Sequence, residues 1–389
     1  MMDYSKLISN TLQEIKPSGI RKFFGLVSEM SDVTALTVGQ PDFVTPWHIR
    51  EAAVESLERG KTYYTSNAGL DGLRSSISAY MQRRFSLGYS SKDEIFVTVG
   101  GSEAIDVAMR SLINPGDEVI IPMPSFVCYE PIARMAGAVT VTVETRPEDG
   151  FRLTAEALSR AITKKTKLLV LPFPNNPTGA IMKKEDLTAI ADVLRGTDIL
   201  VLSDEIYSEL TYGTHHTSIA NIEGMKERTV IVSGFSKTYA MTGWRLGYVC
   251  APAPLIKQML KLHQYAIMCA PTVSQFAAIE ALEHGDADIE YMKAEYNRRR
   301  VFIHDGLTSM GLECHKPEGA FYIFPKIDIL GLSSDEFCER LLYEEKCAII
   351  PGTAFGACGE GYARISYAYS MRHIAEALEK IERFIKKQK

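Results

Sequence analysis

One lysine of this chain lies among small residues and is followed by an arginine eight positions later. The stretch reads Ser233-Gly-Phe-Ser-Lys-Thr-Tyr-Ala-Met-Thr-Gly-Trp-Arg-Leu-Gly247, so the pair is Lys237 and Arg245. A lysine amine that loses its proton attacks an aldehyde, and Gly234 and Ser236 leave room for a ring beside the backbone. Arginine binds a phosphate through two parallel hydrogen bonds. A surface lysine and an arginine in a salt bridge would show the same pattern, so the other motifs must decide.

A second segment has the features of an anion site. Val97-Thr-Val-Gly-Gly-Ser-Glu-Ala-Ile105 reads as a strand, a glycine turn and the start of a helix. The N–H groups at a helix N-terminus, together with the helix dipole, attract a phosphate. An ordinary turn with Ser102 as its N-cap would look the same.

Two further segments carry charged side chains, one after a predicted strand and one within a predicted strand. Ser203-Asp-Glu-Ile-Tyr207 follows the apolar run Ile199–Leu202, and open α/β sheets bind ligands at such ends. A buried carboxylate there would keep a proton on a pyridine nitrogen, although an Asp-Glu pair also begins many ordinary helices. Arg364, in Ala363-Arg-Ile-Ser366, suits a substrate carboxylate or a buried salt bridge.

The lysine stretch resembles the lysine signature of class I pyridoxal-phosphate (PLP) aminotransferases of fold type I. The positions that fit are Gly234, Phe235, Ser236, Lys237, Ala240, Met241, Gly243, Arg245, Leu246 and Gly247. The other motifs follow in the family's order, from Gly39-Gln-Pro-Asp-Phe43 through Pro174-Asn-Asn-Pro-Thr-Gly179 to Ser366. Within this class the chain looks most like bacterial acetyl-diaminopimelate and aspartate aminotransferases.

The resemblance implies a role for each site residue. It makes Lys237, Asp204 and Tyr207 catalytic, with Lys237 holding PLP and Asp204 pairing with the pyridine nitrogen. It assigns the remaining cofactor contacts to Tyr64, Gly101, Ser102, Glu103, Phe126, Asn176, Ser236 and Arg245, and the substrate contacts to Gly39, Asn176 and Arg364. Phe126 would stack on the ring, although a core phenylalanine is the plain alternative. Tyr64 would reach the neighbouring subunit's phosphate, which implies a homodimer with shared sites.

Two positions depart from the family pattern. Many relatives have a phosphate-binding serine where this chain has Gly234, so Ser233 or Ser236 must replace it. A subgroup of aspartate aminotransferases has a lysine at the position of Ser102, so this chain would have to recognise aspartate in another way.

Composition excludes several other classes of protein. The chain has 389 residues, 46% hydrophobic and 23% charged, with a net charge of −5, which is typical of a soluble enzyme and unsuited to nucleic acid. The polar N-terminus and the absence of a long apolar run predict no export signal and no membrane anchor. Seven scattered cysteines without a C-x-x-C pair predict a reducing cytoplasm and no zinc site. The pair His215-His216 is expected in a solvated loop rather than at a metal.

Alternating strand-like and helical segments predict the fold. Strands are expected at Ile95–Val99, Glu118–Ile121, Val139–Val143, Leu168–Leu171, Ile199–Leu202, Thr229–Val232 and, antiparallel, Leu246–Cys250. This pattern predicts an α/β, mostly parallel seven-stranded sheet in a large PLP-binding domain, residues 46–285. Residues 1–45 and 286–389 are expected to form a smaller α+β domain. In it we expect short strands at Ala320–Phe324, Cys347–Ile350 and Ala363–Ser366, a long helix at Asp288–Met310 and a C-terminal helix at Met371–Lys387.

The predicted function is transfer of an amino group from an L-amino acid to a 2-oxo acid, in two half-reactions through PLP and pyridoxamine phosphate. The resemblance favours an acidic or acetyl-diaminopimelate-like donor in amino-acid biosynthesis. The alternative is a PLP-dependent C–S β-lyase of the cystathionine type, which shares the fold. A transcription regulator built on this fold would need an N-terminal DNA-binding domain, and Gly39-Gln-Pro-Asp-Phe43 comes too early for one.

Overall fold

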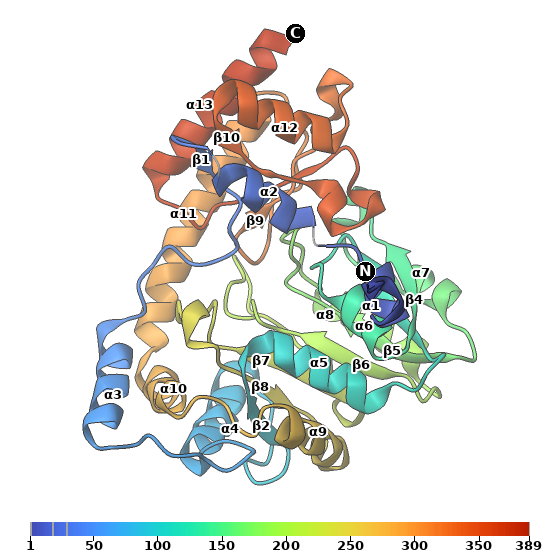
Figure 1. The fold of residues 1–389 in the computed structure, drawn as a ribbon, viewed down its shortest axis with the longest axis vertical. Helices are drawn as coiled ribbons and strands as arrows, with labels where there is room; N and C mark the ends of the chain where they lie inside the picture. The colour runs from blue at the N-terminus through green and yellow to red at the C-terminus, as the bar shows by residue number, and fades with distance from the viewer. Residues whose placement is uncertain (1, 18, 29, 389) are drawn as a thin grey trace.

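A seven-stranded sheet forms the centre of the larger part of the molecule (Figure 1), in a computed structural model that describes residues 2–17, 19–28 and 30–388. Its strands are β2 (Ile95–Thr98), β3 (Glu118–Met123), β4 (Val139–Glu144), β5 (Thr166–Leu171), β6 (Leu200–Asp204), β7 (Thr229–Gly234) and β8 (Gly247–Cys250). They lie in the order β2-β8-β7-β6-β5-β3-β4. Strand β8 is antiparallel to both of its neighbours and the other pairs are parallel, which confirms the mostly parallel sheet and the antiparallel strand after Lys237.

Helices cover both faces of this sheet. The helices of the chain are α1 (Asn10–Glu14), α2 (Gly19–Ser28), α3 (Trp47–Glu58), α4 (Asp71–Phe85), α5 (Gly100–Leu112), α6 (Tyr129–Met135), α7 (Ala155–Ala161), α8 (Lys184–Leu194), α9 (Ala253–Ala266), α10 (Thr272–His284), α11 (Asp286–Ser309), α12 (Ser334–Glu345) and α13 (Met371–Gln388). Val119 and Ile121 of β3 pack with α5, α6 and α9, whereas Ile120 between them packs with α7 and α8. This alternation is the two-residue period of a strand that is buried on both faces.

The smaller part of the molecule contains short strands and the two longest helices. Strands β11 (Ile350–Pro351), β12 (Ala363–Ser366) and β9 (Tyr322–Ile323) form one antiparallel sheet, and β1 (Thr34–Ala35) pairs with β10 (Cys347–Ala348). Figure 1 shows α11 running from α10 beside the large sheet up to α13. The segment after β1 therefore leads from the small sheets toward the large one, and it carries Gly39.

Two expectations from the sequence differ from the structure, and one strand was not predicted. The predicted strand Cys347–Ile350 is divided into β10 and β11, which pair with different partners. Strand β1 could not be predicted from the sequence, because two residues are too few to show the apolar–polar alternation of a strand. His216 does not lie in solvent, since its side chain is 7% exposed and its Nε2 lies 3.0 Å from the Glu205 carboxylate. The domain boundaries at residues 46 and 285 stay a prediction.

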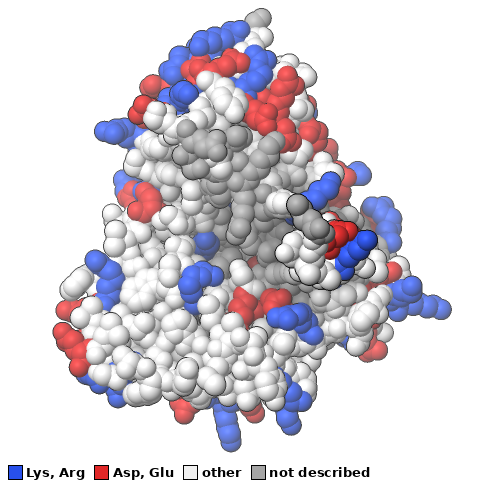
Figure 2. Space-filling model, in the orientation of Figure 1, with Lys and Arg blue, Asp and Glu red and all other residues white. Residues whose placement is uncertain are grey.

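The surface and the helices add two observations. Acidic and basic side chains are interspersed over the face shown in Figure 2. Within the described part of the chain, no helix combines the length and the apolar character that crossing a membrane requires.

Candidate active site

A cavity of about 310 Å³ lies where the large sheet, the segment around Gly39 and strand β12 meet. Eleven of the predicted site residues line it: Gly39, Gly101, Ser102, Phe126, Asn176, Asp204, Tyr207, Ser236, Lys237, Arg245 and Arg364. They come from segments up to 325 residues apart, counting from Gly39 to Arg364 (364 − 39). The sequence shows only the order of these motifs along the chain, and the structure shows that they meet in one cavity.

Lys237 lies just beyond the C-terminal end of β7, where the strand Thr229–Gly234 stops. Its Nζ donates a 2.6 Å hydrogen bond to the carbonyl oxygen of Gly39. Burial, and then the positive charges of Arg245 and Arg364, lower the pKa of Lys237 to about 8. A larger fraction of this amine is therefore neutral near physiological pH than of a solvated lysine, and the neutral amine is the nucleophile.

Asp204 is the last residue of β6, so its side chain is presented at the same edge of the sheet as Lys237. Its carboxylate accepts hydrogen bonds from the hydroxyl of Tyr129 at 2.7 Å and from the Ile206 N–H at 3.2 Å. Burial raises the pKa of Asp204 to about 6, although the bond from Tyr129 opposes that rise. Both donors are neutral, so a cation placed against Asp204 would lower the cost of its buried charge.

The N-terminus of α5 and Arg245 form the other end of the cavity. The N-cap residue, Val99, makes no side-chain hydrogen bond to the first helical turn, and Gly101 and Ser102 of that turn line the cavity. A Cβ added at Gly100, which has φ +77°, would lie 2.7 Å from the Arg245 guanidinium. The guanidinium and the helix N-terminus therefore lie side by side, as an anion site requires.

Of the two candidate serines, the structure places only Ser236 in the cavity lining. Ser233 is on β7 and its hydroxyl donates to the Glu205 carbonyl oxygen at 3.4 Å. A side chain at Gly234 would meet the backbone of Gly247 at 2.9 Å, so a serine does not fit there. The departure from the family pattern thus has a packing reason.

Arg364 is 2% exposed and lines the same cavity as Lys237. Its guanidinium donates to the Asn176 side-chain oxygen at 3.1 Å and to the Thr37 carbonyl oxygen at 2.5 Å. The guanidinium also stacks on the ring of Tyr322, 4.7 Å from its centroid. Its Nε is buried without a hydrogen-bond partner among the described residues. In the part of the chain that the structure describes, Arg364 therefore has no carboxylate partner and keeps one donor unused, unlike the buried salt bridge that was the alternative.

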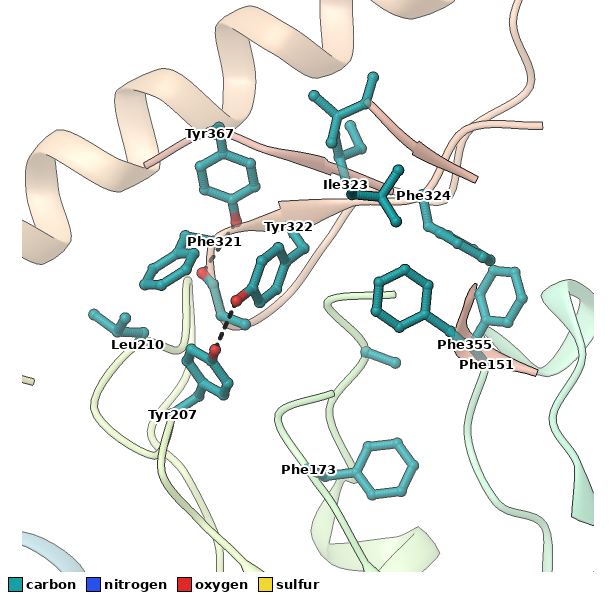
Figure 3. Packing of buried hydrophobic residues seen from close by; sticks show 14 of the residues in the cluster. Phe151, Phe173, Tyr207, Leu210, Phe321, Tyr322, Ile323, Phe324, Phe355 and Tyr367 are labelled. Atoms are coloured by element: carbon teal, nitrogen blue, oxygen red, sulfur yellow. Dashed lines mark hydrogen bonds between the residues drawn. The ribbon is translucent and has the colours of Figure 1, made fainter. Parts of the chain in front are cut away.

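Tyr129 and Tyr322 also line the cavity, but neither belongs to a motif that is recognisable in the sequence. Tyr322 shares a 2.8 Å hydroxyl–hydroxyl hydrogen bond with Tyr207, and Figure 3 shows the two hydroxyl groups pointing toward each other. Tyr129, which donates a hydrogen bond to Asp204, begins α6 three residues after Phe126. Only that spacing could have pointed to Tyr129, whereas Tyr322 lies in a two-residue strand without a recognisable pattern.

Two predicted residues lie outside the cavity lining. Glu103 points its carboxylate at His263 and at the Val99 N–H, so its side chain makes structural contacts rather than lining the cavity. Tyr64 is 76% exposed in the single chain.

Comparison with known proteins identifies the family. The family model for aminotransferase class I and II matches residues 31–381. The chain belongs to this family. It is 53% identical to the Bacillus subtilis protein named "Putative aminotransferase YugH", with 98% of each chain covered. It is 45% identical to the "Probable N-acetyl-LL-diaminopimelate aminotransferase" of the same organism, covering 98% of this chain and 97% of that one. The aspartate aminotransferase of Thermus thermophilus, solved with maleate, superimposes with a TM-score of 0.93 at 39% identity, covering 97% of this chain and 99% of that one.

The protein is a PLP-dependent aminotransferase of fold type I. The cavity of this aminotransferase fits the cofactor, because it offers an amine for the aldehyde, a carboxylate for the pyridine nitrogen and a cationic helix terminus for the phosphate. When bound, PLP withdraws electrons from the substrate's α-carbon.

Proposed function

We propose that this aminotransferase takes its amino group from an acidic or acetyl-diaminopimelate-like L-amino acid, in amino-acid biosynthesis. Two relatives support this proposal, since one is named for N-acetyl-LL-diaminopimelate and the other for aspartate. The observation that carries the reaction itself is the convergence of Lys237, Asp204 and Arg364 in one cavity.

The roles of the chain's residues follow from their positions. Arg364 would hold the α-carboxylate of the donor, because it offers an unused Nε–H beside its two bonded nitrogens. Lys237 would carry the proton away from the α-carbon, since its lowered pKa suits a base at neutral pH. Asp204 would keep the pyridine nitrogen protonated, and Ser236, Ser102 and Arg245 would bind the phosphate.

The donor's distal group needs a partner of its own. Among the described lining residues the cations are Lys237, Arg245 and Arg364, and each already has a role. A distal carboxylate would therefore be met by polar groups from outside this lining, such as those of a second copy of the chain. This argument makes the homodimer with shared sites part of the proposal.

An exposed aromatic surface supports that dimer. Tyr63 is 56% exposed, Tyr64 76% and Tyr265 87%, with Met268 beside them at 45%. Asn67 and Thr272 join these segments, through hydrogen bonds to the carbonyl oxygens of Met268 and Tyr63. Exposed aromatic and methionine side chains are typical of protein interfaces. Sedimentation of the purified protein should show a dimer, and a stable active monomer would remove this part of the proposal.

The cytoplasm is the proposed location. All seven cysteines are free in the structure, which suits a reducing compartment.

The experiment that tests the donor is a titration of the holoenzyme with single amino acids in the absence of a 2-oxo acid. The panel contains L-aspartate, L-glutamate, N-acetyl-LL-diaminopimelate, an aromatic amino acid and cystathionine. Loss of the resting absorbance band and formation of pyridoxamine phosphate with the acidic or acetylated members would support the proposal. Conversion by the aromatic member alone would overturn it. An unchanged band with pyruvate and ammonia accumulating would indicate a lyase.

A further inference from the structure

A buried histidine lies behind the helix terminus that borders the cavity. His263 of α9 is fully buried, and its Nδ1 lies 2.5 Å from Oε1 of Glu103. Helix α9 packs against α5 (Figure 1), and the imidazole meets the ring of Phe96 edge-on at 5.5 Å. The histidine therefore contacts the fourth residue of α5, and neither of these two residues lines the cavity.

The same glutamate holds the turn before the helix. The other carboxylate oxygen of Glu103, Oε2, accepts a hydrogen bond from the N–H of Val99, the N-cap residue. The hydroxyl of Thr98 donates to the carbonyl oxygen of Gly100 at 3.0 Å. From β8, a Cβ at Gly247 would lie 2.9 Å from the Gly101 nitrogen. The turn is thus held between β8 and the Glu103–His263 pair. A small displacement of Glu103 would therefore also shift the backbone of Gly101 and Ser102.

The hydrogen bonds indicate how the imidazole is oriented. Its Nε2 is buried and has no hydrogen-bond partner among the described residues. A buried N–H without a partner costs more than a bare ring nitrogen, so the proton belongs on Nδ1, where it is donated to Glu103. Without that donor the carboxylate would lose one of its two partners in a buried site.

We infer that His263 is a positioning residue for the cofactor phosphate, acting through Glu103 on the turn at residues 98–102. Glu103 itself serves the phosphate by shaping this turn, without contact between its carboxylate and the cofactor. The inference rests on the proposed placement of the phosphate at the N-terminus of α5, and it is independent of the donor amino acid.

The test compares two ligands of the apoenzyme, PLP and pyridoxal, which lacks the phosphate. In His263→Leu, the Kd for PLP should rise about tenfold, as expected for loss of one hydrogen bond to a charged group. The Kd for pyridoxal should stay unchanged. His263→Asn should restore PLP affinity, because its side-chain amide can donate from near the position of Nδ1. His48→Leu is the matched control, because it also removes a histidine–carboxylate contact, but with Glu280 and Asp288 and outside the cavity.

Each outcome decides one point. Unchanged PLP affinity in His263→Leu, equal losses of PLP and pyridoxal, or no recovery in His263→Asn would overturn the role of His263. Wild-type apoenzyme that binds pyridoxal as tightly as PLP would instead overturn the placement of the phosphate. If His263→Leu fails to fold, Glu103→Gln answers the same question, because its amide nitrogen must face one of the two N–H donors, and it should show the same selective loss of PLP affinity.

Discussion

Lys237 and Gly39, 198 residues apart, are joined by a 2.6 Å hydrogen bond from the lysine Nζ to the glycine carbonyl oxygen. The bond links the loop after β7 to the segment that arrives from the small sheets. The amine lies in the same cavity as Arg364, the candidate anchor for the substrate carboxylate. The nucleophile is therefore oriented by backbone from another part of the chain.

Replacing Lys237 by alanine should abolish transamination and leave the fold intact. The substitution removes a buried amine whose hydrogen-bond partner is a single carbonyl group. Far-ultraviolet circular dichroism of the variant should match that of the wild type. Measurable turnover in the purified variant would contradict the assignment of Lys237.

The rate at which apoenzyme captures PLP should rise with pH, with a midpoint near the pKa of about 8 of Lys237. The neutral amine is the reactive form, so capture increases as the proton leaves. Arg364→Gln should move the midpoint upward, because one of the positive charges that lower this pKa is then gone. A midpoint near 10.5, the value of an ordinary lysine, would show that the amine is solvated.

Asp204→Asn should stabilise the apoenzyme and inactivate the holoenzyme. The pKa of Asp204 is raised from 3.8 to about 6, so the folded chain binds this proton more tightly than the unfolded chain. The contribution of Asp204 to stability is fully present below pH 4 and is lost as pH rises through 6. Asparagine stays neutral, so above pH 7 the variant apoenzyme should be more stable by about 3 kcal/mol.

The measurement for this variant is denaturant unfolding of both apoenzymes at two pH values. The difference in stability should shrink toward zero near pH 4. Activity should fall by orders of magnitude because the pyridine nitrogen loses its counter-charge. If the variant apoenzyme is no more stable than the wild type at pH 8, burial of the ionised Asp204 carboxylate does not destabilise the fold.

Arg364→Lys should lower kcat/KM for amino acids by about a hundredfold, because a lysine cannot form the two parallel hydrogen bonds of a guanidinium. The Kd for PLP should change little, since Arg364 bonds to Asn176 and Thr37 and makes no hydrogen bond to the described residues at the N-terminus of α5. Steady-state kinetics and a cofactor titration measure the two effects. Equal losses in both would assign Arg364 to the structure of the cavity.

Gly39→Ala should reduce activity at least tenfold, because the new Cβ would lie 2.2 Å from the Tyr322 hydroxyl oxygen. Tyr322→Phe removes that oxygen and leaves the ring carbon as the nearest atom, at 3.2 Å. The double variant should therefore recover part of the lost activity, which a double-mutant cycle on kcat/KM would quantify. Additive losses would show that the two residues do not interact.

Local sequence determined the sheet strands and the order of the motifs. A buried strand is specified by its own run of apolar residues, so β2 to β8 could be predicted to within a few residues. The eight-residue spacing of Lys237 and Arg245 lies within the single loop that joins β7 to β8. Tertiary structure decided what meets across the cavity. Tyr322 bonds to Tyr207 from 115 residues away, and His263 reaches Glu103 from 160. Such contacts depend on how separate elements pack, and a two-residue strand or a buried histidine on a helix has no period or spacing from which its partner could be deduced.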